Sequence, residues 1–204
     1  MGFYSEVIFP RLCDLLLGRP LIVRQRQTLL ASARGEVLEI GFGTGLNLPH
    51  YPQRIRKITT VDPNPGMLRL AQRRIRRVRI EVEQHVLNGE RLPFADASFD
   101  CAVSTFTLCS INEVNQALGE VYRVLRPGGQ LLFLEHGLSP EPRVQRWQRR
   151  LNWLEMRLGD GCRLDRDIKG LIAGQPFVSV EAAEFYLERT PRTHGYLYRG
   201  TAVK

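Results

Sequence analysis

The sequence has no apolar run long enough to cross a membrane. Its most apolar early stretch, residues 7–17, is interrupted by Pro10, Arg11 and Asp14 and is too short to span a bilayer. The same stretch lacks the basic start and the small-residue cleavage site of a secretory signal peptide. These absences argue against membrane-spanning and secreted classes, so we expect a cytoplasmic protein.

Cysteine and histidine are scarce, with four of each in the chain. The cysteines form no C-x-x-C pair and the histidines are scattered, so the spacing predicts no metal site. Cys101 and Cys109 fall in and beside a predicted interior strand, where reduced thiols are expected. Acidic residues are also in deficit: 29 Lys and Arg face 21 Asp and Glu, a net charge of +8. This balance is compatible with an anionic partner but identifies none.

The length and composition fit an ordinary globular enzyme. The chain has 204 residues, of which 25% are charged and 43% hydrophobic, which is enough to bury a full core. The simplest reading is a single domain over residues 1–204. Within it we expect a helical N-terminal extension or cap over residues 1–34 and a core over residues 35–204.

A glycine-rich turn organises the core. An apolar run within residues 35–45 ends in three glycines spaced by two, Gly41, Gly43 and Gly45. This pattern predicts a buried strand that delivers a tight turn, where bare backbone lets a ligand approach closely. A dinucleotide turn needs G-x-G-x-x-G, but here the third glycine comes one place early and Leu46 stands in its position.

Two acidic residues narrow the choice of ligand. Glu39 precedes the first glycine by two positions, where a carboxylate would repel a diphosphate but suits a ligand with an ammonium group and a positive sulfur. S-adenosylmethionine (SAM) carries both. Asp62, in the sequence Val-Asp-Pro-Asn about twenty residues after the glycines, is placed to accept the ribose hydroxyls. The alternative is a glycine-rich turn that binds no ligand.

This combination resembles the class I SAM-dependent methyltransferases. The resemblance implies an α/β fold: a Rossmann-like, seven-stranded, mostly parallel sheet with helices on both faces, an antiparallel last strand and an N-terminal helical cap. It implies SAM as cofactor and places Asn88 beside adenine, where the family usually has Asp. The predicted cofactor-binding residues are Glu39, Gly41, Gly43, Gly45, Asn47, Asp62, Pro63, Met67, Asn88, Gly89, Glu90 and Thr105.

The rest of the chain alternates predicted strands and helices. The clearest helix pattern runs from Val114 to Leu125, and we expect Asn112 to cap it. Arg-Pro-Gly-Gly at 126–129 ends that helix and leads into a strand, a second hallmark of the resemblance. The other predictions are strands over 58–61, 79–87, 99–104 and 130–134, helices over 21–33, from Pro65 and over 143–158, and an antiparallel hairpin over 176–188 and 194–203.

Two features left alternatives open. Residues 3–17 carry a helical apolar stripe interrupted at Pro10, which fits a helix packed on the domain, a lid over the site or a membrane-surface helix. Under the lid reading, Tyr4 and Phe9 are candidate pocket residues. Arginines cluster over 69–77 and 143–150, a pattern typical of a solvated face and also compatible with RNA or acidic lipid.

Several further segments narrow the resemblance: Asp-Pro-Asn-Pro at 62–65, Thr-Leu-Cys-Ser at 107–110, the 124–129 turn, Glu135-His136, Trp147-Gln148, Asp-Gly-Cys at 160–162 and Ala-Val-Lys at 202–204. Through them the second half resembles the methyltransferase-like thiol S-methyltransferases. This chain departs from that group by lacking its long N-terminal membrane anchor and by having Asp165 where its members usually carry Thr. The resemblance implies methyl transfer to a small thiol or sulfide.

The catalytic prediction rests on position. A thiol must react as thiolate, yet with a pKa of about 8.5 only a few per cent is ionised at neutral pH. His136, at the end of a strand that points at the predicted crevice, is the candidate base or orienting group, and Asp160 is the second candidate. The plainer reading of His136 is a histidine satisfied by backbone or water. Cys109 and Cys162 are interpreted as packing residues.

Other functions remain open at this point. The acceptor could instead be a lipid, a quinone precursor or another small molecule methylated at O, N or C, because class I sites share the cofactor half and vary the cap. An RNA-binding protein with a vestigial cofactor pocket and a dehydrogenase are the other classes. We expect a small-molecule methyl acceptor, weak contact with a membrane surface at most, and no nucleic acid. The sequence does not indicate an oligomeric state.

Overall fold

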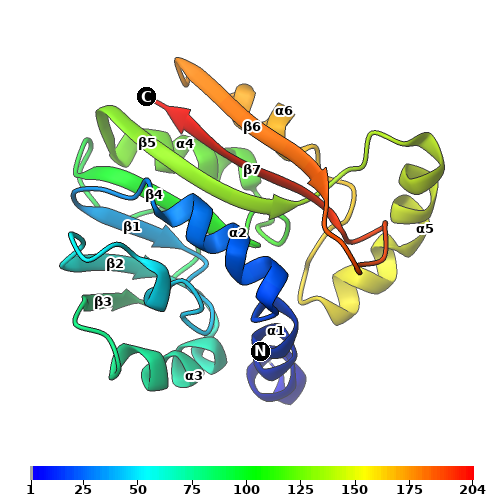
Figure 1. The fold of residues 1–204 in the computed structure, drawn as a ribbon, viewed down its shortest axis with the longest axis horizontal. Helices are drawn as coiled ribbons and strands as arrows, with labels where there is room; N and C mark the ends of the chain where they lie inside the picture. Colours follow the sequence, from blue (N-terminus) through cyan, green and yellow to red (C-terminus); the bar gives the residue numbers. More distant parts are fainter. Residues whose placement is uncertain (1) are drawn as a thin grey trace.

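One twisted sheet of seven strands runs through the computed structural model, which describes residues 2–204 (Figure 1). The strand order is β3-β2-β1-β4-β5-β7-β6. β7 lies antiparallel to β5 and β6, and the pairs from β3 to β5 are parallel. The predicted fold class, including the antiparallel last strand, is therefore confirmed. The strands are β1 (Val37–Ile40), β2 (Lys57–Val61), β3 (Glu81–His85), β4 (Phe99–Thr105), β5 (Leu125–His136), β6 (Ser179–Tyr186) and β7 (Tyr196–Val203).

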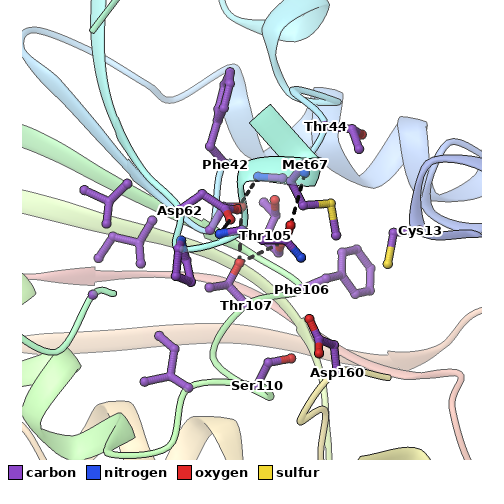
Figure 2. A pocket seen from close by; sticks show the side chains of 18 of the residues that line it. Cys13, Phe42, Thr44, Asp62, Met67, Thr105, Phe106, Thr107, Ser110 and Asp160 are labelled. Carbon is purple, nitrogen blue, oxygen red and sulfur yellow. Dashed lines mark hydrogen bonds between the residues drawn. The ribbon is translucent and has the colours of Figure 1, made fainter. Parts of the chain in front are cut away.

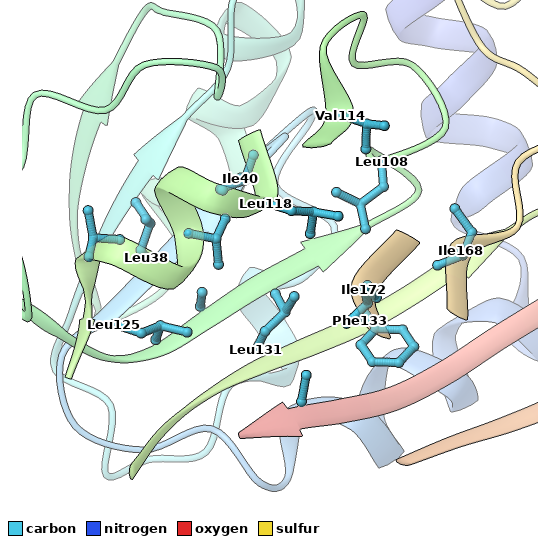
Figure 3. Close-up of a cluster of buried hydrophobic side chains, with 14 of the residues drawn as sticks. Leu38, Ile40, Leu108, Val114, Leu118, Leu125, Leu131, Phe133, Ile168 and Ile172 are labelled. Carbon is cyan, nitrogen blue, oxygen red and sulfur yellow. The ribbon is translucent and has the colours of Figure 1, made fainter. Parts of the chain in front are cut away.

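Helices cover both faces of the sheet, and successive side chains of β1 point alternately to the two faces. All four residues of β1 are buried, as expected of a central parallel strand. Leu38 and Ile40 point into the core beneath α4 (Val114–Val124) and α6 (Ile168–Ala173), which Figure 3 shows. Val37 points the other way, into a second cluster with α2 (Pro20–Leu30) and α3 (Pro65–Ile75). Glu39 shares the side of Val37.

The start of α3 is capped by neighbouring residues, whereas the start of α4 differs from the prediction. The Asn64 side chain accepts hydrogen bonds from the backbone N–H groups of Gly66 (2.8 Å) and Met67, and Pro65 occupies the first turn of α3. The predicted cap of α4, Asn112, is wrong. The helix begins one residue later, after Glu113, whose backbone N–H is held by the Glu90 carboxylate at 3.1 Å.

The N-terminal stripe forms two joined helical pieces rather than a broken helix. A π-helical turn, η1 (Tyr4–Ile8), continues into α1 (Phe9–Leu17). Pro10 lies in the first turn of α1 and has no N–H to donate to the turn before it; the Glu6 carbonyl, four residues earlier, accepts from Arg69 at 3.3 Å instead. α2, which the sequence assigns to the extension, buries Ile22, Leu29 and Leu30 against the sheet and is part of the core layer.

The remaining elements lie around the carboxyl ends of the strands. α5 (Pro142–Leu158) lies beyond the end of β5 and to one side of the sheet (Figure 1). The short helix η2 (Leu48–His50) follows the glycine turn. The predicted antiparallel hairpin is confirmed as β6 and β7. Across residues 2–204, no helix combines the length and the apolar character needed to cross a membrane.

Candidate active site

The glycine turn has the backbone shape that its sequence predicts. Gly41, Gly43 and Gly45 all have positive φ, at 68°, 58° and 76°. Gly41 also lies against a neighbouring loop, because a Cβ added to it would fall 2.0 Å from Thr107 Oγ1. Glycine is thus required at this position for both conformation and space.

Asp62 connects the glycine turn to the start of α3. Its Oδ2 accepts a hydrogen bond from the Gly43 backbone N–H at 2.7 Å, and its Oδ1 accepts one from the Asn64 N–H at 2.8 Å. The side chain is buried, with 6% of the residue exposed, and burial raises its pKa above the ordinary value. Even so it lines a cavity above the turn, which leaves carboxylate lone pairs for a ligand.

That cavity, here called the glycine-turn cavity, has a volume of about 310 Å³. This is at the lower end of the range for small-molecule sites. Figure 2 shows Asp62, Met67, Thr105 and Asp160 around it. The predicted cofactor-binding residues that line it are Gly41, Gly43, Asp62, Pro63, Met67, Asn88, Gly89, Glu90 and Thr105, whereas Glu39, Gly45 and Asn47 do not.

Glu39 lies beneath the turn instead of in the cavity. Only 1% of it is exposed, because the alternation of β1 turns its side chain towards α2. Its carboxylate accepts hydrogen bonds from the Tyr51 hydroxyl (2.6 Å) and the Asn47 amide (2.9 Å). Burial raises its pKa to about 7, against the effect of these bonds and of Arg26. In this structure Glu39 supports the turn from below, and its contact with the cofactor ammonium stays a prediction.

Arg26 is a site residue that the sequence analysis missed. It comes from α2, is 3% exposed and lines the glycine-turn cavity. One of its terminal nitrogens donates to Asn47 Oδ1 and Thr105 Oγ1, both at 2.7 Å, while its buried Nε has no hydrogen-bond partner among residues 2–204. Burial lowers its pKa to about 10. The available signal was its spacing, since it shares a helical stripe with buried Ile22 and Leu30.

A second, larger cavity adjoins the first. Its volume is about 980 Å³, and its lining combines apolar side chains of α1 and α2 with the mixed segment 187–197, which includes Glu188 and Arg189. The two cavities share lining residues, which are Phe9, Cys13, Leu17, Phe106 and Ser110. Tyr4 and Phe9, the predicted lid residues, both line this second cavity, so α1 and the turn before it cover the site. We call it the apolar cavity.

Sulfur and imidazole groups gather in the wall of the apolar cavity. His136 Nε2 lies 3.0 Å from Cys162 Sγ, which lies 3.5 Å from Cys109 Sγ. All three residues line the cavity, so His136 faces the crevice as predicted. The sequence treated the two cysteines as packing residues and missed the cluster, because its members come from three separate segments. Asp160 is not part of it; it lines the glycine-turn cavity and accepts a hydrogen bond from the Ser5 hydroxyl at 2.7 Å.

Buried hydrogen bonds fix the loop that separates the two cavities. The Glu135 carboxylate is fully buried and accepts from the Thr107 N–H (2.8 Å) and the Ser104 hydroxyl (2.7 Å). Phe106 follows β4 directly and has a backbone φ of 54°. Its ring stacks on His136 with 6.4 Å between the ring centroids. Arg26 lies over the same ring at 5.4 Å. The boundary between the cavities is thus rigid and aromatic.

Comparison with known proteins matches this geometry. A family model described as a methyltransferase domain matches residues 38–133, which include the glycine turn, Asp62 and β4. The chain thus contains a SAM-dependent methyltransferase domain. The methyltransferase core therefore includes the cavity above the glycine turn, and the family and fold imply SAM as its cofactor.

Curated relatives of this methyltransferase include thiol S-methyltransferases. The chain is 39% identical to thiol S-methyltransferase TMT1B of Rattus norvegicus over 135 residues, which cover 64% of this chain and 55% of the relative. It is 35% identical to TMT1B of Homo sapiens over 165 residues, covering 79% and 65%. The chain thus spans less than two thirds of the length of these relatives. A ubiquinone/menaquinone C-methyltransferase, UbiE of Escherichia fergusonii, is 37% identical over 108 residues, covering 50% and 43%.

Solved structures share the fold of this methyltransferase. A SAM-dependent methyltransferase of Thermotoga maritima aligns with a TM-score of 0.67 at 20% identity, covering 97% of this chain and 98% of that one. The [4+2]-cyclase SpnF aligns with a TM-score of 0.65 at 20% identity, covering 96% and 80%. Similarity at this level establishes the fold alone, and the cyclase illustrates that one fold carries different chemistry.

Proposed function

We propose that the chain transfers the methyl group of SAM to a small apolar thiol. The observation that carries this proposal is the apolar cavity of about 980 Å³ that adjoins the glycine-turn cavity and has sulfur and imidazole groups in its wall. A thiol is weakly hydrated and soft, so such a cavity would favour it over an alcohol or amine of the same shape. The similarity to thiol S-methyltransferases supports the same choice.

The cofactor half is assigned to the glycine turn and its neighbours. The bare backbone at Gly41 and Gly43 allows close approach of a ligand, and the buried Asp62 carboxylate offers acceptors suited to ribose hydroxyls. Asn88 and Gly89 line the same cavity. SAM supplies an already activated methyl group. The chain therefore has to hold donor and acceptor in line, and good alignment alone is worth roughly 7–11 kcal/mol.

The acceptor half is assigned to the apolar cavity. The acceptor sulfur gains the methyl group, S-adenosylhomocysteine leaves with both electrons of the broken carbon–sulfur bond, and the thiol proton passes to solvent. His136 Nε2 is already 3.0 Å from Cys162 Sγ, so we assign His136 an orienting role in preference to that of a free base. Asp160, in the wall of the glycine-turn cavity, remains the second candidate for contact with the reacting groups.

An acceptor panel tests this proposal. The protein is incubated with methyl-labelled SAM and equal concentrations of an alkanethiol, the alcohol and the primary amine of the same chain length, and sulfide. We expect S-adenosylhomocysteine to form with the thiol, with the label recovered in a thioether. Labelled methyl that appears only on oxygen or nitrogen would overturn the thiol assignment and leave the family membership intact.

A second candidate is C-methylation of a quinone precursor. It is favoured by the similarity to UbiE and by an apolar cavity large enough for a ring compound. Addition of a quinol precursor to the panel distinguishes the two, because label on a ring carbon without thioether formation would favour this candidate.

Contacts with larger partners also remain proposals. Exposed apolar side chains on the N-terminal helices and on α5, among them Phe3 (73%), Leu15 (70%) and Trp153 (69%), support weak contact with a membrane surface. RNA binding would have to show a steep inverse dependence on salt. Four free cysteines support a reducing compartment such as the cytoplasm.

A further inference from the structure

We propose that Cys109, His136 and Cys162 bind a zinc ion in the wall of the apolar cavity. The site is inferred from these three side chains and does not depend on the methyl acceptor. Its use in activating a thiol, developed below, rests on the proposed function. The spacing of the sequence predicted no metal site, because the three ligands are far apart along the chain.

The ligand atoms already have nearly the separations that zinc requires. Cys162 Sγ lies 3.0 Å from His136 Nε2 and 3.5 Å from Cys109 Sγ, and all three ligand atoms lie within 4.8 Å of one another. Tetrahedral coordination with Zn–S bonds of about 2.3 Å and Zn–N bonds of about 2.0 Å separates its ligands by roughly 3.5–3.8 Å. Small side-chain rotations would therefore complete the site.

Hydrogen bonds to the backbone hold the segments that carry the cysteines in place. Cys109 follows β4, His136 ends β5, and Cys162 follows the turn after α5. The two cysteine loops are joined directly, because the Arg163 backbone N–H donates to the Cys109 carbonyl at 3.0 Å. The Arg166 guanidinium donates to the carbonyls of Leu108 and Ile111 in the same loop. Such support is typical of a site whose ligands must be fixed in place.

Ordinary packing and hydrogen bonding account poorly for the cluster. A thiol is a weak donor and a weak acceptor, so two buried thiols and an imidazole satisfy one another incompletely. The second ring nitrogen, His136 Nδ1, is buried without a hydrogen-bond partner in the described part of the chain. Two sulfurs and one imidazole nitrogen that converge on a point are instead the donor set preferred by zinc.

The fourth coordination position would face the apolar cavity. All three residues line that cavity, and among residues 2–204 no fourth metal-ligating side chain completes the group. The nearby Glu155 carboxylate is engaged by His194 at 3.2 Å. Structural zinc sites have four protein ligands, whereas sites with three keep a position open for water or substrate. The arrangement therefore matches a site that takes a ligand from the cavity.

An acceptor thiol is the natural fourth ligand. A thiol that binds zinc releases its proton to solvent and coordinates as thiolate, which retains lone pairs for attack on a methyl carbon. In the transfer the sulfur–methyl bond forms as the methyl–sulfonium bond breaks. Both electrons of the broken bond stay with the departing sulfide, so no oxidant or reductant is needed. A zinc-bound thiolate would remove the need for a free base.

Metal binding can be measured without cofactor or acceptor. The purified chain is kept reduced with a phosphine, stripped with a chelator and titrated with zinc, and the bound metal is counted after desalting. We expect one zinc per chain. With cobalt(II) in its place we expect thiolate-to-metal charge-transfer bands and the visible spectrum of a tetrahedral ion. A wild-type chain that retains no zinc and gives the spectrum of hydrated cobalt overturns the proposal.

Variants locate the site. Cys109→Ala, Cys162→Ala and His136→Ala should each weaken zinc binding at least tenfold. The matched control is Cys101→Ala, which removes a buried cysteine of β4 outside the cluster and should keep one zinc per chain. Circular dichroism and a thermal melt confirm that each variant is folded. If the Cys101→Ala and Cys162→Ala variants each bound half as much zinc as the wild type, the zinc would not be bound by the cluster.

The acceptor step has its own readout. Addition of an alkanethiol to the cobalt-loaded chain should shift the visible bands, whereas the alcohol of the same length should not. Thiol methylation that proceeds equally well in the metal-free chain overturns zinc activation while leaving the proposed function standing. Zinc binding without thiol methylation has the opposite meaning, because it keeps the metal site and overturns the acceptor assignment.

Discussion

At the scale of single residues, Asp62 joins the glycine turn to α3 through one carboxylate. Its two oxygens hold the N–H groups of Gly43 and Asn64, and the side chain still lines the glycine-turn cavity. Hydrogen bonds to a charged group contribute about 1.5–3 kcal/mol each. We therefore expect Asp62 to act on the cofactor in two ways, by shaping the turn and by offering acceptors.

Asp62→Asn should weaken SAM binding about 10- to 100-fold, because the amide keeps only one acceptor oxygen and loses the charge. Isothermal titration with SAM measures the Kd. The matched control is Asp96→Asn, which alters an aspartate whose side chain is 78% exposed and should leave the Kd unchanged. A folded Asp62→Asn variant that binds SAM as tightly as the wild type would contradict the assignment.

Glu39 should make stability depend on pH. Burial raises its pKa from 4.5 to about 7. Between these values the folded chain keeps a proton that the unfolded chain has released. The stability contributed by this proton is fully present below about pH 4.5 and is lost as the pH rises through about 7, a change of roughly 3 kcal/mol at most.

Glu39→Gln should remove this dependence. The advantage of the wild type over the variant in free energy of unfolding should shrink between about pH 5 and pH 8, as measured by urea denaturation. Groups elsewhere titrate alike in both proteins and cancel in the difference. Two stability curves that run parallel across this range would show that Glu39 does not titrate there.

At the scale of elements, the N-terminal helices are docked on the start of α3. The Asn64 amide donates to the Ser5 carbonyl at 2.9 Å. A Cβ added to Gly66 would fall 2.0 Å from the Glu6 carbonyl oxygen, so the two backbones are in direct contact. The same helices line both cavities through Phe9, Cys13 and Leu17. Of the three readings of this segment, its position agrees with two, a helix packed on the domain and a lid over the site.

Gly66→Ala should displace the lid and leave the sheet intact. We expect faster hydrogen exchange over residues 4–17, unchanged protection in β1 and β4, and weaker SAM binding. The control is Gly119→Ala in α4, where the nearest atom to an added Cβ lies 3.8 Å away. This change should stabilise the helix by about 0.5–1 kcal/mol. Unaltered exchange over residues 4–17 in the Gly66 variant would mean that the contact does not hold the lid.

At the scale of the whole molecule, the sequence predicts the fold and most of the cofactor half. The reason is that β1, the glycine turn and Asp62 are close in sequence, and the parallel pairing of β1 with β2 brings them together. Local spacing indicates the direction of the Glu39 and Arg26 side chains, on β1 and α2. It does not identify the partners of Arg26, because Asn47 and Thr105 come from other segments of the chain.

The residues around the apolar cavity are harder to predict from the sequence, because they come from distant segments of the chain. Cys109, His136 and Cys162 are brought together by the ends of β4 and β5 and the turn after α5. Their convergence depends on tertiary structure, so spacing rules for metal ligands do not detect it. The position of His136 at a strand end was predictable, whereas its neighbours were not.

Thiol methylation in the apolar cavity is tested most directly by the specificity constants of straight-chain alkanethiols and their matched alcohols, measured with saturating SAM. An apolar acceptor cavity predicts that kcat/KM for the thiols rises up to about fourfold per added methylene, since each buried methylene contributes about 0.8 kcal/mol, until the cavity is full. The alcohols should give no product. A flat thiol series, or alcohols methylated as fast as thiols, would contradict the account.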